Sequence, residues 1–150
     1  MASLNGRHRL RCERGAELIE FALVLPLLLF IIMGLIDFGF LFQRFQVVTN
    51  AAREGARMAV LPGYATADVT ARVQSYVSTG GLATTGTNPS VTVTNVTIPT
   101  GGGPVLQGKR VQVTYVSTYL FLGPLAGWFG GTFTTANLVG TAIMRDELAP

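Results

Sequence analysis

The amino-acid sequence predicts an α+β fold, in which a long N-terminal α-helix precedes a short helix and a small antiparallel β-sheet. The first observation behind this prediction is an apolar run from Phe21 to Ile36 without any charged or hydrogen-bonding side chain. The second is a helical pattern that continues past this run until Pro62 and Gly63, a pair that typically ends a helix. The third is the stretch 90–144, which holds segments of alternating polarity rich in threonine and β-branched residues.

The apolar run is long enough to cross a bilayer, because about 20 mostly apolar residues span a hydrocarbon core of about 30 Å. Four arginines precede it within residues 1–15. Arginines close to a first span are normally retained in the cytoplasm, so the C-terminal part is predicted to lie outside. A secretory signal peptide is the main alternative. It is disfavoured because the run exceeds the usual length of about 7–15 residues and no small-x-small cleavage site follows it.

Two carboxylates bracket the predicted span. Asp37 lies seventeen residues beyond Glu20, which corresponds to about 26 Å of helical rise and is close to the thickness of the hydrocarbon core. We therefore expect Asp37 to mark the outer interface, with Arg44 near the same level. Pro26 lies between the two acids and leaves the carbonyl of Ala22 without its usual partner, so a kink or loosened turn is expected there.

Beyond the span, residues 43–60 form a predicted stem helix with a polar face and a face of small and apolar side chains. Small residues on the second face recur every four positions and permit close helix packing. They are Ala51, Ala52, Gly55, Ala56 and Ala59. We expect this face to pack against the globular domain, against other helices, or partly against both.

The remaining chain reads as a separate small domain. Thr66 is a predicted N-cap of an amphipathic helix that extends to about Ser78. Strands are predicted at 90–98, 111–116 and 133–144. The domain organisation is therefore a basic leader, a transmembrane and stem helix, and an extracytoplasmic α+β domain. Their respective ranges are 1–15, 16–62 and 63–150.

Residues 120–129 are very apolar but are interrupted by glycine and proline. They are too few to span a bilayer. We expect a hydrophobic loop that folds over the sheet, with a membrane-resting or partner-binding patch as the alternative.

Composition argues against several classes of protein. The formal net charge of +3 is carried by the leader, since residues 16–150 hold seven basic and seven acidic side chains. No basic surface remains for nucleic acid, which needs clustered lysines or arginines. Cys12 and His8, the only residues of their types, also lie in the leader. We therefore predict no enzyme, no metal site, no cofactor and no small-molecule substrate.

Four residues carry a resemblance to a known family. Gly15 and Ala16, followed by Glu20 and Phe21, stand behind a basic leader and ahead of an apolar helix. This arrangement resembles the processing site of the type IV pilin superfamily, and most of all its tight-adherence (Tad) branch. In that family a membrane aspartic peptidase cleaves after the glycine, so the resemblance implies cleavage between Gly15 and Ala16.

Longer segments extend the resemblance. Residues 19–26 (IEFALVLP) and 49–57 (TNAAREGAR) are similar to TadE-like minor pilins, or pseudopilins, and residues 141–145 (TAIMR) also fit. The resemblance covers most of 14–62 closely and the rest loosely. It implies a pilin-like fold and a role in assembly or priming of a Tad (Flp-type) pilus, in adhesion or related secretion. The implied partners are the prepilin peptidase, the major Flp-type pilin, other minor pilins and the inner-membrane assembly platform.

Glu20 has a physical role in such a system. Cleavage would create a positively charged α-amine on Ala16. In a low-dielectric bundle of spans, this amine and Glu20 of a neighbouring subunit would attract each other and set the register between subunits. An internal pair, with the two residues about 7.5 Å apart along the helix, and a carboxylate hydrated at the membrane interface are the alternatives.

The predicted location is the bacterial cytoplasmic membrane, with a single span, a cytoplasmic N-terminus and the domain outside. Processing would also permit incorporation into a pilus. The alternative function is an unprocessed single-span anchor that carries an extracytoplasmic binding or sensor domain.

Overall fold

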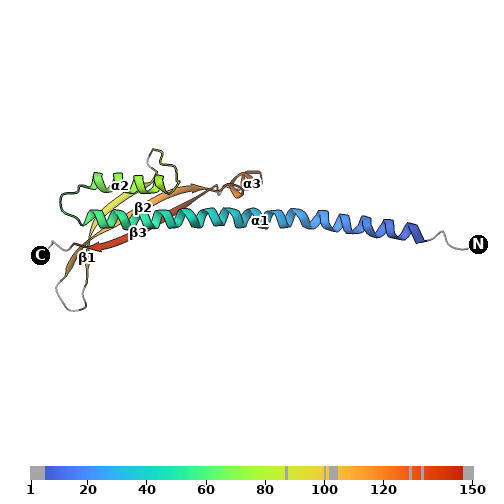
Figure 1. Ribbon diagram of the computed structural model, residues 1–150, viewed down its shortest axis with the longest axis horizontal. Coiled ribbons are helices and arrows are strands. Elements are labelled where there is room, and N and C mark those ends of the chain that lie inside the picture. The colour runs from blue at the N-terminus through green and yellow to red at the C-terminus, as the bar shows by residue number, and fades with distance from the viewer. Residues whose placement is uncertain are drawn as a thin grey trace, which may run out of the picture.

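The computed structural model describes residues 6–86, 88–99, 101, 105–128, 130–132 and 134–146. In chain order, the elements are α1 (Gly6–Ala59), α2 (Thr66–Thr79), β1 (Ser90–Ile98), β2 (Leu106–Thr118), α3 (Leu122–Trp128) and β3 (Thr135–Arg145). Figure 1 shows an elongated molecule in which the N-terminal half of α1 projects from a small domain built around its C-terminal half. The predicted α+β fold with a small antiparallel sheet is confirmed.

Helix α1 begins at Gly6, ten residues before the predicted start at Ala16, and ends at Ala59, close to the predicted end. It continues through Pro26 as an α-helix, so the expected disturbance does not break it. After α1, the N–H of Leu61 donates to the carbonyl of Met58 at 3.1 Å. Gly63 then adopts a φ of 88°, a conformation that favours glycine and turns the chain back towards α2.

Helix α2 packs antiparallel to the end of α1 (Figure 1). Its buried residues are Val69, Val73 and Val77, which share one helical face. The predicted cap at Thr66 is wrong by one residue, because Ala65 occupies the N-cap position. The first turn is instead closed by Asp68, whose Oδ2 accepts a hydrogen bond of 2.8 Å from the N–H of Ala65.

The sheet has the order β1-β2-β3, and both strand pairs are antiparallel. The bounds of β1 are the predicted ones. Strand β2 begins at Leu106, five residues before the predicted start. It pairs with a neighbour on each side, and this pairing outweighs the weak local preference of glycine, here Gly108, for a strand. Strand β3 covers Thr135–Arg145, and residue 133, where the predicted strand starts, lies outside the described residues.

The core lies where α1 meets α2 and the central strand. Val48 of α1, Val73 of α2 and the strand residues Val111 and Val113 are fully buried. Gly140 of β3 permits a close approach of two backbones, since a Cβ there would lie 2.8 Å from the carbonyl oxygen of Val48. The C-terminal half of α1 is therefore an integral part of the domain.

Residues 122–128 form helix α3, so the prediction of a loop over the sheet is wrong for this segment. α3 lies beside α1 near the middle of the long helix (Figure 1). Its buried residues are the small Gly123 and Ala126. The local sequence obscured the helix because glycine and proline, which usually end helices, occur within or next to it.

Candidate functional site: the apolar helix and its attachment to the domain

The N-terminal half of α1 exposes apolar side chains on all sides. Large apolar residues with exposed side chains begin at Leu18 and continue to Phe45. Within the described residues, α1 from Gly15 to Ala59 is the one helix that is long and apolar enough to cross a membrane, judged by length and composition. Such a surface is unusual for a protein in water, and it is consistent with anchoring in a membrane.

The four residues of the predicted processing site lie on the projecting part of α1. Ala16, Glu20 and Phe21 are exposed, and Gly15 is partly exposed. Because one helical turn separates Ala16 from Glu20, the two residues share a face of the helix. Among the described residues, Glu20 takes part in no ion pair.

The fold itself does not require a glycine at position 15. A Cβ added to Gly15 would meet no atom within 4 Å, and this residue lies inside a regular helix. Glycine is unfavourable within a helix by about 1 kcal/mol relative to alanine. Its presence is therefore unexplained by packing, in contrast to Gly55, where a Cβ would lie 2.6 Å from Cγ2 of Val73.

The small-residue face of the stem packs within this chain. Its members Ala51, Ala52, Gly55, Ala56 and Ala59 are all buried. They lie in the core against α2 and the sheet. Of the packing partners considered from the sequence, the chain's own domain occupies this face, and none of the five residues is left on the surface for another helix.

Asp37 joins α1 to the start of α3. Its side chain is only 3% exposed. The carboxylate accepts hydrogen bonds from the N–H groups of Leu120 at 2.9 Å, Phe121 at 3.0 Å and Leu122 at 2.6 Å. Those of Phe121 and Leu122 are among the N–H groups that a helix starting at Leu122 cannot satisfy internally. The residue expected only to mark an interface therefore holds a distant segment in place.

Arg44 makes a second attachment two turns further along the same face of α1. Its Nη1 donates to Oγ of Ser117 at 2.6 Å and to the carbonyl of Thr118 at 2.8 Å. Ser117 is almost completely buried. Arg44 therefore fixes the end of β2, and Asp37 fixes the chain that immediately follows it.

The sequence analysis did not predict these attachments by Asp37 and Arg44. The available signal was the spacing of Asp37 and Arg44, because residues seven apart in a helix project from nearly the same side. The partners could not be identified, since they lie more than 70 positions away in sequence.

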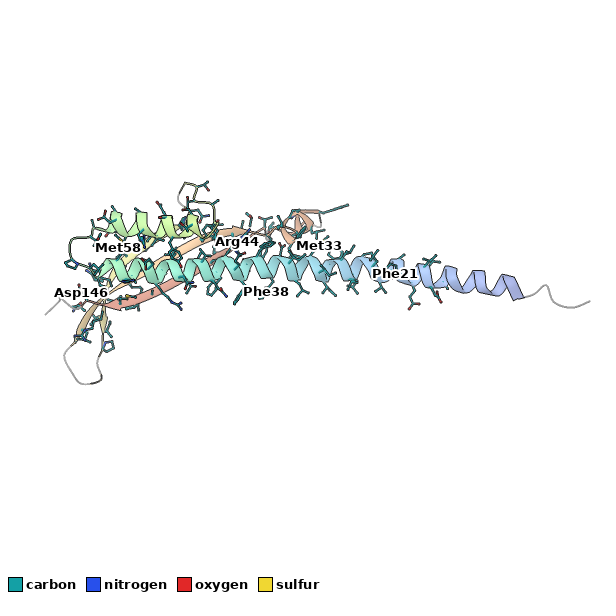
Figure 2. All side chains as sticks on the ribbon, in the orientation of Figure 1. Phe21, Met33, Phe38, Arg44, Met58 and Asp146 are labelled. Atoms are coloured by element: carbon teal, nitrogen blue, oxygen red, sulfur yellow. The ribbon has the colours of Figure 1, made fainter. Side chains whose placement is uncertain are left out.

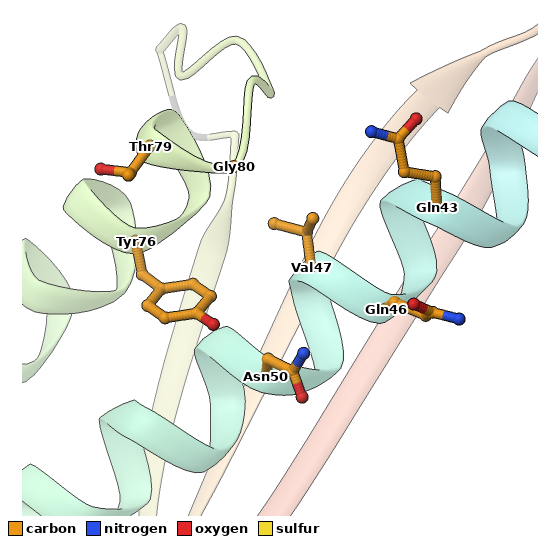
Figure 3. A pocket seen from close by; sticks show the side chains of 7 residues that line it. All are labelled: Gln43, Gln46, Val47, Asn50, Tyr76, Thr79 and Gly80. Carbon is orange, nitrogen blue, oxygen red and sulfur yellow. The ribbon is translucent and has the colours of Figure 1, made fainter.

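The domain also has a shallow groove between α1 and α2 (Figure 3). Its volume is about 320 Å³, and it opens to solvent. The lining residues are Gln43, Gln46, Val47, Asn50, Tyr76, Thr79 and Gly80. None of them is an acidic, basic or cysteine residue, and within the described part of the chain no three His, Cys, Asp or Glu residues gather as a metal site would require. We assign this groove no chemistry.

In a comparison with known proteins, residues 15–57 match the family model of TadE-like proteins. No curated protein and no solved structure matches the chain. The matched segment starts at the glycine of the predicted processing site and includes the apolar helix and most of the stem. It confirms the resemblance inferred from the sequence. The segment from Gly15 to Arg57 is thus TadE-like, and its helix is suited to anchoring the protein in a membrane.

Proposed function

We propose that this protein is a TadE-like minor pilin, or pseudopilin, that contributes to the assembly or priming of a Tad (Flp-type) pilus. The observation that carries the proposal is the projecting half of α1, which matches the TadE-like family and leaves its apolar side chains uncovered by the protein's own domain. Such a helix needs lipid around it before assembly and other apolar helices around it within a filament or its base.

The proposed topology places residues 1–15 in the cytoplasm, α1 across the bacterial cytoplasmic membrane and the α+β domain outside. In this arrangement the protein is a substrate of the prepilin peptidase and has no catalytic role of its own. Its further partners are the major Flp-type pilin, other minor pilins and the inner-membrane assembly platform.

Glu20 is proposed to set the register of the assembled subunits. It projects from a part of α1 that contacts no other element of the chain within the described residues. After cleavage, the amine of Ala16 on one subunit would pair with Glu20 of a neighbour, because each charge left alone among apolar helices is strongly disfavoured.

Processing is tested by mass spectrometry of the protein purified from its native cells, with and without the prepilin peptidase. The expected N-terminus is Ala16 when the peptidase is present, and the full chain when it is absent. Gly15→Leu should block cleavage without disturbing the fold, because the position is open. Gly39→Leu is the matched control, since it is equally open and lies outside the site. An uncut chain in cells that build normal pili would contradict the proposal.

The role of Glu20 is tested by Glu20→Ala, with Glu17→Ala as the matched control. Both residues are exposed acids on the same part of α1. Glu20→Ala should preserve membrane insertion but abolish pilus assembly, whereas Glu17→Ala should preserve both. If both variants assemble pili equally well, the register role is wrong. Tolerance of Glu20→Ala together with an uncut N-terminus would favour the unprocessed anchor with an external binding or sensor domain.

A further inference from the structure

Helix α3 and the residues just before it bury small residues against the protein and expose large apolar side chains to the surroundings. Its buried residues are Gly123 and Ala126. By contrast, the side chain of Trp128 at its end is 84% exposed, and that of Leu120 just before it is 55% exposed. Residues 120–128 contain no charged side chain. An exposed tryptophan on an uncharged apolar helix is costly in water and marks a surface that contacts something else.

This apolar surface lies beside the helix that could cross the membrane. Asp37 binds the chain at the start of α3. Met33 and Gly34, one turn earlier on the same face of α1, are partly buried, whereas the other residues between positions 16 and 36 are exposed. Figure 2 shows Met33 next to α3. The short helix is therefore level with residues 33–37 of the long one.

The length of the apolar part of α1 places this level at the bilayer boundary. Exposed apolar side chains extend from Leu18 to Phe45, which corresponds to about 40 Å of helical rise, more than the hydrocarbon core of about 30 Å. A core that begins near Glu20 ends near residue 40. Because α3 lies level with positions 33–37, a bilayer around α1 also reaches α3.

The attachment of α3 removes the main obstacle to contact with lipid. Burial of a carboxylate in the outer part of a span is normally unfavourable in free energy. The carboxylate of Asp37, however, accepts hydrogen bonds from three N–H groups, and the residue is only 3% exposed. The same contacts satisfy N–H groups at the start of α3 that would otherwise need water. The contact between Asp37 and the start of α3 can therefore enter the membrane interface with these polar groups hydrogen-bonded.

We propose that residues 120–128 form a second membrane contact, in which Leu120 and Trp128 rest in the outer lipid interface beside the span. Tryptophan favours this region because its ring is largely apolar while its N–H can reach the headgroups. Asp37 fixes the start of the segment to α1, and Arg44 fixes the end of β2 just before it. The contact would therefore set both the depth of the span and the orientation of the domain on the membrane. This inference rests on α1 crossing the bilayer and does not require the pilus role.

The test uses the intrinsic fluorescence of Trp128, which is the only tryptophan in the chain. The full-length protein is reconstituted in vesicles of phosphatidylethanolamine and phosphatidylglycerol, and flotation after an alkaline wash checks that α1 has inserted. We expect blue-shifted emission and quenching by lipids brominated near the headgroup end of the acyl chain. Quenching by aqueous acrylamide should be several-fold weaker than in the control.

The control is Trp128→Phe combined with Leu61→Trp. Leu61 is exposed just beyond the C-terminal end of α1, so the tryptophan introduced there should emit at long wavelength and be quenched freely by acrylamide. The proposal is overturned if Trp128 behaves like this control in protein that floats with the vesicles. It is also overturned if Trp128 becomes protected only after other pilus subunits are added, because the surface would then be a subunit interface. If the protein does not float with the vesicles, α1 does not cross the bilayer and the inference is overturned as well.

Discussion

The carboxylate of Asp37 accepts a hydrogen bond of 2.6 Å from the N–H of Leu122, which lies 85 positions later in the chain. This contact ties the outer part of the apolar helix to the start of α3. Arg44, on the same face of α1, binds the end of β2. The two residues attach this face of α1 to the domain. The domain and the apolar helix are therefore joined by more than the stem.

Asp37→Ala should release α3 from α1. The substitution removes the acceptor for three N–H groups, and a loss of charged hydrogen bonds of this kind costs about 2 kcal/mol. Because α3 is short, we expect local opening of residues 120–128. Hydrogen–deuterium exchange of the full chain in detergent should show faster exchange in this segment.

The control for Asp37→Ala is Asp68→Ala, which removes the exposed acceptor at the start of α2. Its effect should be confined to the first turn of α2. Unchanged exchange at residues 120–128 in Asp37→Ala would mean that the contact with Leu122 does not hold α3.

Arg44→Ala should destabilise the domain more than Ser117→Ala. The first variant leaves both Ser117 and the carbonyl of Thr118 without their donor, at a cost of about 1–3 kcal/mol. The second retains the bond from Arg44 to Thr118. Thermal unfolding of the two variants in the same detergent measures the difference, and equal midpoints would show that the carbonyl contact contributes nothing.

Gly140→Ala should be among the most damaging small substitutions in the sheet. A Cβ there would lie 2.8 Å from the carbonyl oxygen of Val48 and 2.9 Å from Cα of Thr49. Because these are backbone atoms, relief requires β3 to move away from α1, and overpacking of this kind costs about 1–3 kcal/mol. Denaturant unfolding should detect this loss. Gly39→Ala, at an open position, should have no destabilising effect.

Glu54→Gln should change stability very little. Glu54 forms the ion pair with Arg72 at 2.8 Å, but both side chains are accessible to solvent. Exposed pairs of this kind contribute about 0–1 kcal/mol and are screened by salt. A large loss of stability at low salt that disappears at high salt would show that this pair joins α1 to α2 more strongly than its exposure implies.

Local sequence predicted the elements whose signals lie within one continuous segment. The apolar run indicated the exposed half of α1, Pro62 and Gly63 indicated its end, and alternating polarity gave β1 its correct bounds. Each of these signals depends only on neighbours along the chain. The predicted start of β2 lies five residues too far along the chain. The true start depends on pairing with both β1 and β3, which is a property of the folded sheet and not of neighbouring residues.

The sequence alone therefore determined that this chain has a long apolar helix and a small α+β domain, because composition and periodicity are sufficient for both. The likeness of residues 15–57 to TadE-like proteins is also a property of the sequence alone. Only the tertiary structure decided that the small-residue face is filled by the chain's own domain, that residues 122–128 are helical, and that Asp37 and Arg44 hold the end of β2 and the start of α3. Those outcomes depend on contacts between residues that are far apart in the sequence. Such contacts form only when the chain has folded, so no pattern within one short segment specifies them.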